Sequence, residues 1–197
     1  MFAYIKGTLQ KATPAFVVLD NNGIGYHVNI SLNTYSKIQG KKECQLFIHY
    51  YIRDESLPLL YGFADELEKT LFLDFISVSG IGPSTAVMIL SSYNPAEIQR
   101  AVVDGNVQLL KSIKGIGPKS AQRIVLELKD KMAKNIGASG LANSSPQHNT
   151  LIDETLSALV TLGIPRSGAQ KTINKVLKAN PAIDTVELLV KTCLKNL

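Results

Sequence analysis

The sequence is poor in cysteine and in long hydrophobic runs, and each shortage excludes a class of protein. Its 197 residues include 2 cysteines, Cys44 and Cys193, which lie far apart and outside any CxxC spacing. This excludes a disulfide framework and a zinc knuckle, and it is typical of a protein in a reducing compartment. No stretch approaches the ~20 apolar residues that cross a bilayer, and the first residues lack the apolar core of a signal peptide. We therefore expect a cytoplasmic protein that does not enter the membrane.

Positive charge is in slight excess overall, and the excess is confined to one segment. The formal net charge is +5, which many proteins without a nucleic-acid partner share. Between residues 111 and 134, however, seven basic residues stand against two acidic ones, so this segment carries the whole excess. A localised basic stripe indicates a polyanionic partner more strongly than the total does. The basic residues are Lys111, Lys114, Lys119, Arg123, Lys129, Lys131 and Lys134.

Residues 1–63 have the pattern of short β-strands. Runs rich in Val, Ile, Tyr and Phe cover residues 2–9, 15–20, 26–30, 44–53 and 59–63. The sequence Asp-Asn-Asn-Gly at 20–23 predicts a tight turn because Asn and Gly tolerate positive φ, and residues 54–58 are a second candidate hairpin tip. Five strands with one helical turn near residues 32–38 predict a small barrel of OB type. A plain β-meander fits the same pattern.

Residues 64–134 change to a helical period, and the chain then passes through a region without periodicity. Prolines at 83, 95 and 118 suit the first turns of three further helices. Residues 135–150 are rich in Gly, Ser and Asn and predict a flexible linker. Residues 151–197 predict three short helices at about 151–162, 165–178 and 184–196. The apolar face of the first helix after residue 64 is predicted to hold Leu67, Leu71, Phe72, Phe75 and Ile76.

One eleven-residue pattern occurs twice. Gly-Ile-Gly-Pro-Ser-Thr-Ala-Val-Met-Ile-Leu at 80–90 recurs 35 residues later as Gly-Ile-Gly-Pro-Lys-Ser-Ala-Gln-Arg-Ile-Val at 115–125, with six positions identical. Each copy follows an apolar helical stretch, so the repeat predicts two equivalent helix–turn–helix units.

The repeated pattern predicts an anion-binding corner. Its glycines permit a reversal of the chain within three residues and leave no side chain in front of the peptide planes. Ile81 and Ile116 are expected to point inward and hold each turn to the core. Each following helix starts at proline and presents unpaired N–H groups and the positive end of its dipole, which suits a DNA phosphate. Such contacts position a protein on DNA without reading bases.

The predicted DNA-contacting residues combine these corners with their basic neighbours. Ser84 and Lys119 occupy equivalent places beside the two corners, and only Lys119 carries a charge. A simple tight connection between helices is the alternative for either corner alone. The candidate residues are Gly80, Ile81, Gly82, Ser84, Lys114, Gly115, Ile116, Gly117, Lys119 and Arg123.

Other binding motifs fail on their spacing. Lys-Ser at 119–120 lacks the first glycine and the preceding strand of a P-loop, and Gly-Ile-Gly at 23–25 lacks the third glycine of a dinucleotide site. His27, His49 and His148 are scattered and have the character of ordinary strand or linker residues. We expect no catalytic site, no cofactor and no metal.

Taken together, the chain resembles the RuvA family of Holliday-junction-binding subunits. The resemblance rests on the two corners, on Gly-Ile-Gly-Tyr-His-Val at 23–28, Arg-Asp-Glu at 53–55, Leu-Tyr-Gly-Phe at 60–63, Glu-Lys-Thr-Leu-Phe at 68–72 and Ala-Leu-Val-Thr-Leu-Gly at 158–163. It implies an α+β multidomain chain with an N-terminal OB-fold barrel over 1–63, a central all-α tandem helix-hairpin-helix domain over 64–134, the linker over 135–150 and a C-terminal three-helix domain over 151–197.

The resemblance also implies a function and partners. It implies a homotetramer, with an octamer left open, that holds a four-way DNA junction open, and it matches Asp54 and Glu55 to an acidic pin at the junction centre that keeps strands apart. From the residues alone these two are solvated turn residues. The third domain is implied to bind the RuvB motor ATPase through Leu159, Leu162 and Ile164, for which core packing is the alternative, and RuvC resolvase is a further implied partner. Ser84 departs from the family, whose members often carry Lys there.

Two other functions fit parts of the sequence. A helix-hairpin-helix DNA glycosylase would use Lys119 as its nucleophile, but it also needs a carboxylate in a packed downstream segment. Glu127 and Asp130 continue the same predicted helix, and the next acid, Asp153, lies beyond the linker. A scaffold that uses residues 151–197 and never binds DNA is the second alternative.

Overall fold

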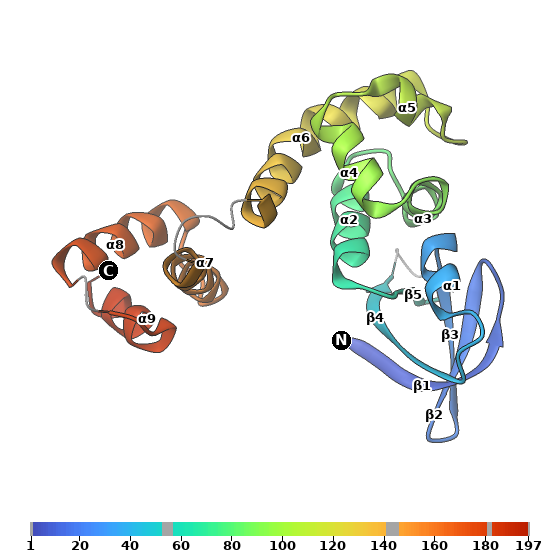
Figure 1. The fold of residues 1–197 in the computed structure, drawn as a ribbon, viewed down its shortest axis with the longest axis horizontal. Helices are drawn as coiled ribbons and strands as arrows, with labels where there is room; N and C mark the ends of the chain where they lie inside the picture. Colours follow the sequence, from blue (N-terminus) through green and yellow to red (C-terminus); the bar gives the residue numbers. More distant parts are fainter. Residues whose placement is uncertain (1, 53–56, 141–145, 181–182, 197) are drawn as a thin grey trace. The chain divides into compact units, whose positions relative to one another are not determined.

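The computed structural model describes residues 2–52, 57–140, 146–180 and 183–196, with the backbone alone for residues 134–140 and 146–150. These residues divide into two compact units, one up to Ile136 and one from Gly137 (Figure 1). No helix among them is long and apolar enough to span a bilayer.

The first unit begins with a closed five-stranded barrel. The strands β1 (Tyr4–Ala12), β2 (Phe16–Asn21), β3 (Ile24–Ile30), β4 (Glu43–Tyr51) and β5 (Leu59–Phe63) are ordered β1-β2-β3-β5-β4, and β1 pairs with β4 to close the barrel. Only β3 and β5 run parallel, with Val28 opposite Leu60. This closure excludes the plain meander and confirms the predicted OB-type barrel.

Local sequence explains the turns and the single helix of the barrel. Asn22 and Gly23 both have positive φ, at 52° and 85°, so the predicted turn joins β2 to β3 as a tight hairpin. The helix α1 (Leu32–Ile38) begins after Ser31, whose side chain accepts a hydrogen bond from the Thr34 amide. The barrel encloses a core of aliphatic side chains and the thiol of Cys44, whose pKa is raised by burial.

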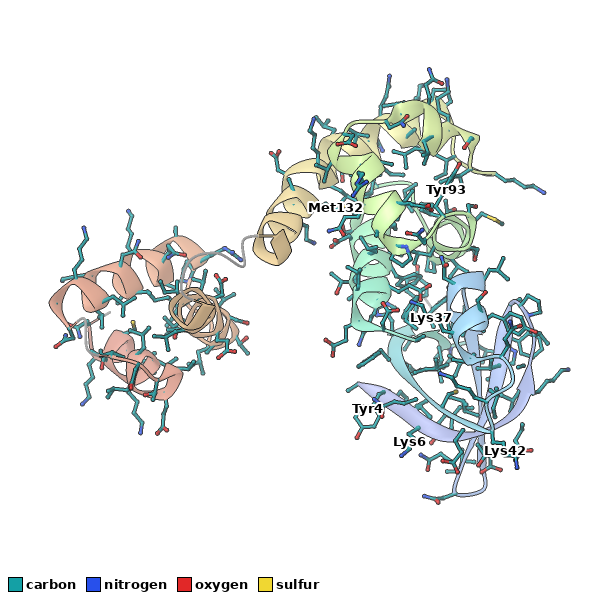
Figure 2. All side chains as sticks on the ribbon, viewed as in Figure 1. Tyr4, Lys6, Lys37, Lys42, Tyr93 and Met132 are labelled. Carbon is teal, nitrogen blue, oxygen red and sulfur yellow. The ribbon has the colours of Figure 1, made fainter. Side chains whose placement is uncertain are left out.

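Five helices follow the barrel: α2 (Glu66–Ser77), α3 (Pro83–Ser92), α4 (Pro95–Val103), α5 (Val107–Ser112) and α6 (Pro118–Gly140). The predicted prolines stand at the first helical position of α3, α4 and α6. Their shared core extends from Leu71 on α2 to Met132 on α6, which Figure 2 labels, and includes two residues of the last barrel strand, Tyr61 and Phe63. Barrel and helices therefore share a core, and the boundary at residue 63 stays a prediction from the sequence.

Two features of the helices concern predictions from the sequence. Leu67 was predicted on the buried face of α2, yet it is 45% exposed, while its neighbour Glu68 is fully buried. Residues 135–150 were predicted as a flexible linker, and within this range α6 continues to Gly140 and the next helix, α7, begins at Pro146. The prediction for Leu67 was wrong because hydropathy is a weak guide to where tertiary contacts fall, and the flexible linker stays a prediction.

The second unit is a separate three-helix bundle. It consists of α7 (Pro146–Thr161), α8 (Arg166–Ala179) and α9 (Val186–Lys195), which surround an apolar core that includes Leu159, Ile173 and Leu189. Cys193 lies in this core as a free thiol, and Cys44 is a free thiol in the barrel.

Candidate nucleic-acid interface

The two repeats fold into the same corner twice. The first joins α2 to α3 and the second joins α5 to α6, and their backbone hydrogen bonds correspond one to one with an offset of 35 residues. In the first corner the bonds run from the Val78 amide to Phe75 (3.1 Å), from Ile81 to Val78 (3.0 Å) and from Ala86 to Gly82 (3.0 Å). In the second they run from Ile113 to Leu110 (3.2 Å), from Ile116 to Ile113 (3.1 Å) and from Ala121 to Gly117 (3.0 Å).

The two glycines of each corner serve different purposes. Gly80 and Gly115 have φ of 88° and 89°, a conformation that residues with a Cβ adopt only with strain. Gly82 has an ordinary φ of −91°, and Gly117 is not among the positive-φ glycines. A Cβ added at Gly82 or Gly117 would meet no atom of the described chain within 4 Å. The fold therefore requires glycine at the first position, while glycine at the third leaves room for a group that approaches from outside.

The isoleucines between these glycines anchor the corners. Ile81 and Ile116 are each 5% exposed and belong to the shared helical core, which confirms that they point inward. The flanking glycines and the starts of α3 and α6 lie at the surface. Gly82 caps α3 without a side-chain hydrogen bond from the described residues, so the first amides of that helix face outward. These corners are accessible, as an anion site requires.

The basic candidates surround the second corner at the surface. Lys114, Lys119 and Arg123 are all exposed. Arg123 also donates a hydrogen bond of 3.3 Å to the Ser79 carbonyl, next to the first corner. A shallow pocket lies between the two corners, lined by Ser79 and Gly80 from the first and by Lys119, Ser120 and Arg123 from the second. The two predicted anion sites are therefore adjacent.

Ser84 lies beside the first corner and faces the barrel. It is exposed, and it lines a shallow pocket together with Tyr61 on β5. Burial raises the pKa of the Tyr61 phenol, and the nearby Tyr51 adds to the rise, while the nearby Ser84 hydroxyl opposes it. Lys119 adds charge to the second corner, whereas Ser84 lies between the first corner and the barrel.

One residue of the basic stripe has a structural partner that the sequence did not reveal. Lys131 forms an ion pair of 2.5 Å with Asp74 on α2, a carboxylate whose side chain is 3% exposed. The other carboxylate oxygen of Asp74 has no partner among the described residues. Removing Lys131 would leave a buried charge unpaired, which is costly. The charge of Lys131 therefore stabilises the contact between α6 and α2, and Lys131 is a weaker candidate for binding a ligand than the basic residues beside the second corner.

The residues predicted for the acidic pin lie outside the described part of the chain, whereas those predicted for the partner surface lie within it. Asp54 and Glu55 lie outside the described residues, between β4 and β5 in the sequence. In the second unit Leu159 is fully buried, and Ile164 is partly buried and packs against the same core. Leu162 is 61% exposed and lines a shallow surface pocket with Ala158 and Thr161. Of the three, Leu162 is the most exposed.

The glycosylase alternative does not fit the geometry of α6. Glu127 and Asp130 are exposed on the same continuous helix as Lys119. At a rise of 1.5 Å per residue they lie ~12 Å and ~16 Å along the axis from Lys119. Neither carboxylate can assist a reaction at the Lys119 amine, since general catalysis requires hydrogen-bond reach.

An OB barrel joined to a tandem of helix-hairpin-helix corners is the architecture of a DNA-binding protein. Comparison with known families agrees. Residues 1–62 match the RuvA N terminal domain, residues 72–130 the SAM-like helix-hairpin-helix tandem and residues 150–197 the RuvA C-terminal domain. The chain belongs to the RuvA family.

Relatives match over the whole length. The chain is 43% identical to the Holliday junction branch migration complex subunit RuvA of Cytophaga hutchinsonii, over 99% of both chains. It is 45% identical to the proteins of the same name from Bacteroides thetaiotaomicron and Flavobacterium psychrophilum, over 100% of both chains in each pair.

Proposed function

We propose that this protein binds four-way DNA junctions through the backbone amides of its two corners and recruits a motor ATPase for branch migration in recombination and repair. The observation that carries the proposal is the pair of exposed, equivalent corners joined by the hydrogen bond from Arg123 to Ser79. Two adjacent anion sites at fixed spacing suit successive phosphates of one DNA arm. The names of the full-length relatives support the same substrate.

The proposed complex has several copies and no catalytic centre in this chain. A homotetramer would present four pairs of corners to the four arms, and Asp54 and Glu55 would stand at the centre and repel phosphates there. The exposed Leu162 would contact a RuvB-type motor, which would supply the ATP hydrolysis, and a RuvC-type resolvase would act on the same junction. The place of action would be the cytoplasm.

A gel shift with a four-way junction and a duplex of the same arm sequence tests the proposal. We expect tighter binding to the junction and a steep loss of affinity with salt, because each phosphate contact contributes ~0.9 to the logarithmic slope. Equal affinity for both DNAs would contradict junction binding, and no binding to either would favour the scaffold alternative. Strand cleavage at a damaged base would favour the glycosylase.

The partner surface is tested by exchanging one exposed leucine for a charge. Leu162→Asp is expected to abolish co-elution with the motor ATPase of the same organism. Leu188→Asp is the matched control, because Leu188 is 49% exposed on α9 of the same bundle. Equal loss in both variants would mean that the bundle has unfolded, and retention in both would remove Leu162 from the interface.

A further inference from the structure

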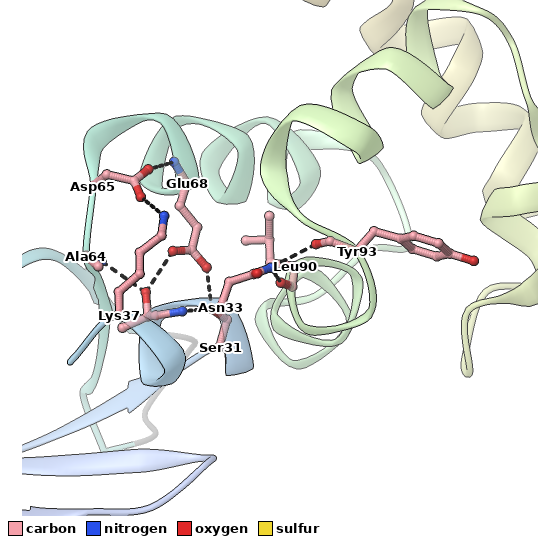
Figure 3. Close-up of polar contacts among 9 residues, drawn as sticks. Ser31, Asn33, Lys37, Ala64, Asp65, Glu68, Leu90 and Tyr93 are labelled. Carbon is pink, nitrogen blue, oxygen red and sulfur yellow. Dashed lines mark hydrogen bonds and ion pairs between the residues drawn. The ribbon is translucent and has the colours of Figure 1, made fainter. Parts of the chain in front are cut away.

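The barrel and the first corner are joined by a polar seam that the proposed binding contacts do not use. We define the seam as the hydrogen-bonded and ionic contacts between α1, with its N-cap Ser31, and the helices α2 and α3 (Figure 3). One exposed pair in it, Lys37 with Asp65, joins α1 to the N-cap of α2. The remaining contacts centre on two residues, Glu68 and Asn33.

Glu68 is a fully buried carboxylate held by two hydroxyl groups of the barrel. Ser31 donates to Oε1, and Thr34 donates to Oε2 at 2.7 Å. The Thr34 hydroxyl also accepts a hydrogen bond of 3.0 Å from the Ala64 amide, where the barrel ends. Burial of a carboxylate is unfavourable unless such partners satisfy it. Both hydroxyls come from a segment more than 30 residues away, so the carboxylate fixes α2 against α1.

Asn33 ties the barrel to the far end of α3. Its side-chain amide donates to the carbonyl oxygens of Leu90 and Tyr93, the latter at 2.8 Å. Beside it, the Leu32 amide donates to the Ser91 hydroxyl at 3.0 Å. The helix α3 has 10 residues, which span roughly 15 Å, and begins at the first corner. One end of this helix therefore faces the proposed phosphate site, and the other is bonded to the barrel.

An aromatic contact reinforces the seam. The ring of Phe72 on α2 is fully buried, with centroids 5.1 Å from Tyr61, 4.9 Å from Phe63 and 5.5 Å from His49. Tyr61, Phe63 and His49 belong to β4 and β5, the two strands that flank Asp54 and Glu55 in the sequence. Close-packed protein interiors transmit displacement because they have little free volume. The first corner and these strands are therefore held at a fixed distance and angle.

We propose that Asn33 and Glu68 are positioning residues for junction selectivity, holding the first corner at the spacing from the barrel that a four-way junction requires. The inference rests on the proposed function. A plain duplex needs only the corners and their cations, whereas a branched DNA must meet the corners and the barrel at once. Loosening the seam therefore weakens junction binding and spares duplex binding, since a site is effective only when its supporting contacts fix its geometry.

The test compares seam variants with a buried carboxylate elsewhere on α2. Asn33→Ala and Glu68→Ala are expected to lower junction affinity about tenfold, with duplex affinity within about twofold of the parent. Glu68→Gln is the conservative rescue, because its amide still bonds both hydroxyls, and it is expected to keep the parent selectivity. Asp74→Asn is the matched control: it breaks the pair with Lys131 inside the helical layer. It is expected to change both affinities by the same factor.

The readout is the ratio of junction to duplex affinity, measured beside the melting temperature of each full-length variant. If Glu68→Ala does not fold, Asn33→Asp provides the second measurement, because it keeps the side-chain shape and removes the two donors. An unchanged ratio in folded Asn33→Ala and Asn33→Asp overturns the inference, as does an equal shift of the ratio in Asp74→Asn. A parent protein without junction preference overturns the proposed function instead, and the parent measurement alone reveals that.

Discussion

The two corners share a backbone and differ in what holds them. The first corner lies beside the barrel at Ser84, which lines a pocket with Tyr61, and α3 is bonded to the barrel at its far end through Asn33. The second corner carries Lys119 and is tied to the first through Arg123. Both corners therefore have the same backbone geometry. The first corner is held in position by contacts with the barrel, and the second corner has a basic side chain beside its amides.

The helix α2 has two buried carboxylates, and each contacts a different part of the first unit. Glu68 faces the hydroxyl groups of α1, and Asp74 faces Lys131 of α6. One helix therefore connects the barrel to the first corner and the first corner to the second. The proposed DNA surface depends on this helix although none of its side chains belongs to the predicted contact set.

Reversing the charge at the second corner is expected to have the largest effect on DNA binding. Lys119→Glu is expected to weaken junction binding by roughly 1.5–3 kcal/mol, a factor between about 10 and about 160, because it replaces the cation proposed to bind phosphate by an anion. The slope of log affinity against log salt should fall by at least ~0.9. The fold should persist because Lys119 is exposed. A gel-shift salt titration measures both quantities, and an unchanged slope would remove Lys119 from the interface.

The second prediction separates the two glycines of one corner. Gly117→Leu is expected to reduce DNA affinity about tenfold with an unchanged melting temperature, because its Cβ would meet no atom of the described chain within 4 Å and the added side chain would obstruct the DNA. Gly115→Ala is expected to cost ~1–2 kcal/mol of stability, since its φ is 89°. Calorimetry and binding measured on both variants check the pair. Equal destabilisation by both substitutions would contradict the division of roles.

The third prediction concerns a variant in which the first corner receives a basic residue at the position that Lys119 occupies in the second corner. Ser84→Lys is expected to raise junction affinity by about fivefold or less and to increase the salt slope by ~0.9. The gain is smaller than the loss at Lys119 because Ser84 lines a pocket with Tyr61 of the barrel, which restricts how the longer side chain can reach toward DNA. Isothermal titration at two salt concentrations measures it. A decrease in affinity would indicate that the fit of Ser84 against the barrel matters more than charge at this corner.

Local patterns in the sequence were sufficient for much of this architecture. The strands, the turn at Asn22 and Gly23, and the two corners follow from residue types that act over a few positions. Pro146 also marked the start of α7, since proline favours the first helical turn, but the surrounding composition obscured it. These features depend on short-range physics.

The seam was not predictable because its partners are distant in the sequence. Hydropathy places Leu67 inside and Glu68 outside, and the fold does the reverse because Ser31 and Thr34 reach Glu68 from the barrel. For the same reason the basic stripe included Lys131, whose partner Asp74 lies far upstream. The positions of charges were evident from the sequence, but their pairing depends on tertiary structure.

The smallest predicted effect is a dependence of stability on pH that comes from the seam. Burial raises the pKa of Glu68 above its ordinary value of 4.5, and the hydrogen bonds from Ser31 and Thr34 only partly oppose it. The folded protein therefore binds this proton more tightly than the unfolded chain does. Its stabilising contribution is fully present below the unfolded pKa and is lost as pH rises through the raised folded pKa. Relative to Glu68→Gln, the parent should lose free energy of unfolding as pH increases.

Urea unfolding of the parent and of Glu68→Gln at matched pH, between about pH 4 and pH 8, measures this difference. The glutamine variant is the suitable reference because it keeps the shape and both hydroxyl contacts, so other titrating groups cancel in the comparison. A parent that gains stability over the variant with rising pH would mean that the two hydroxyl groups outweigh burial. Glu68 would then be an ionised hydrogen-bond acceptor in the folded protein, and the seam would be most stable at neutral pH. The DNA affinities of the corner variants would in that case have to be measured at neutral pH.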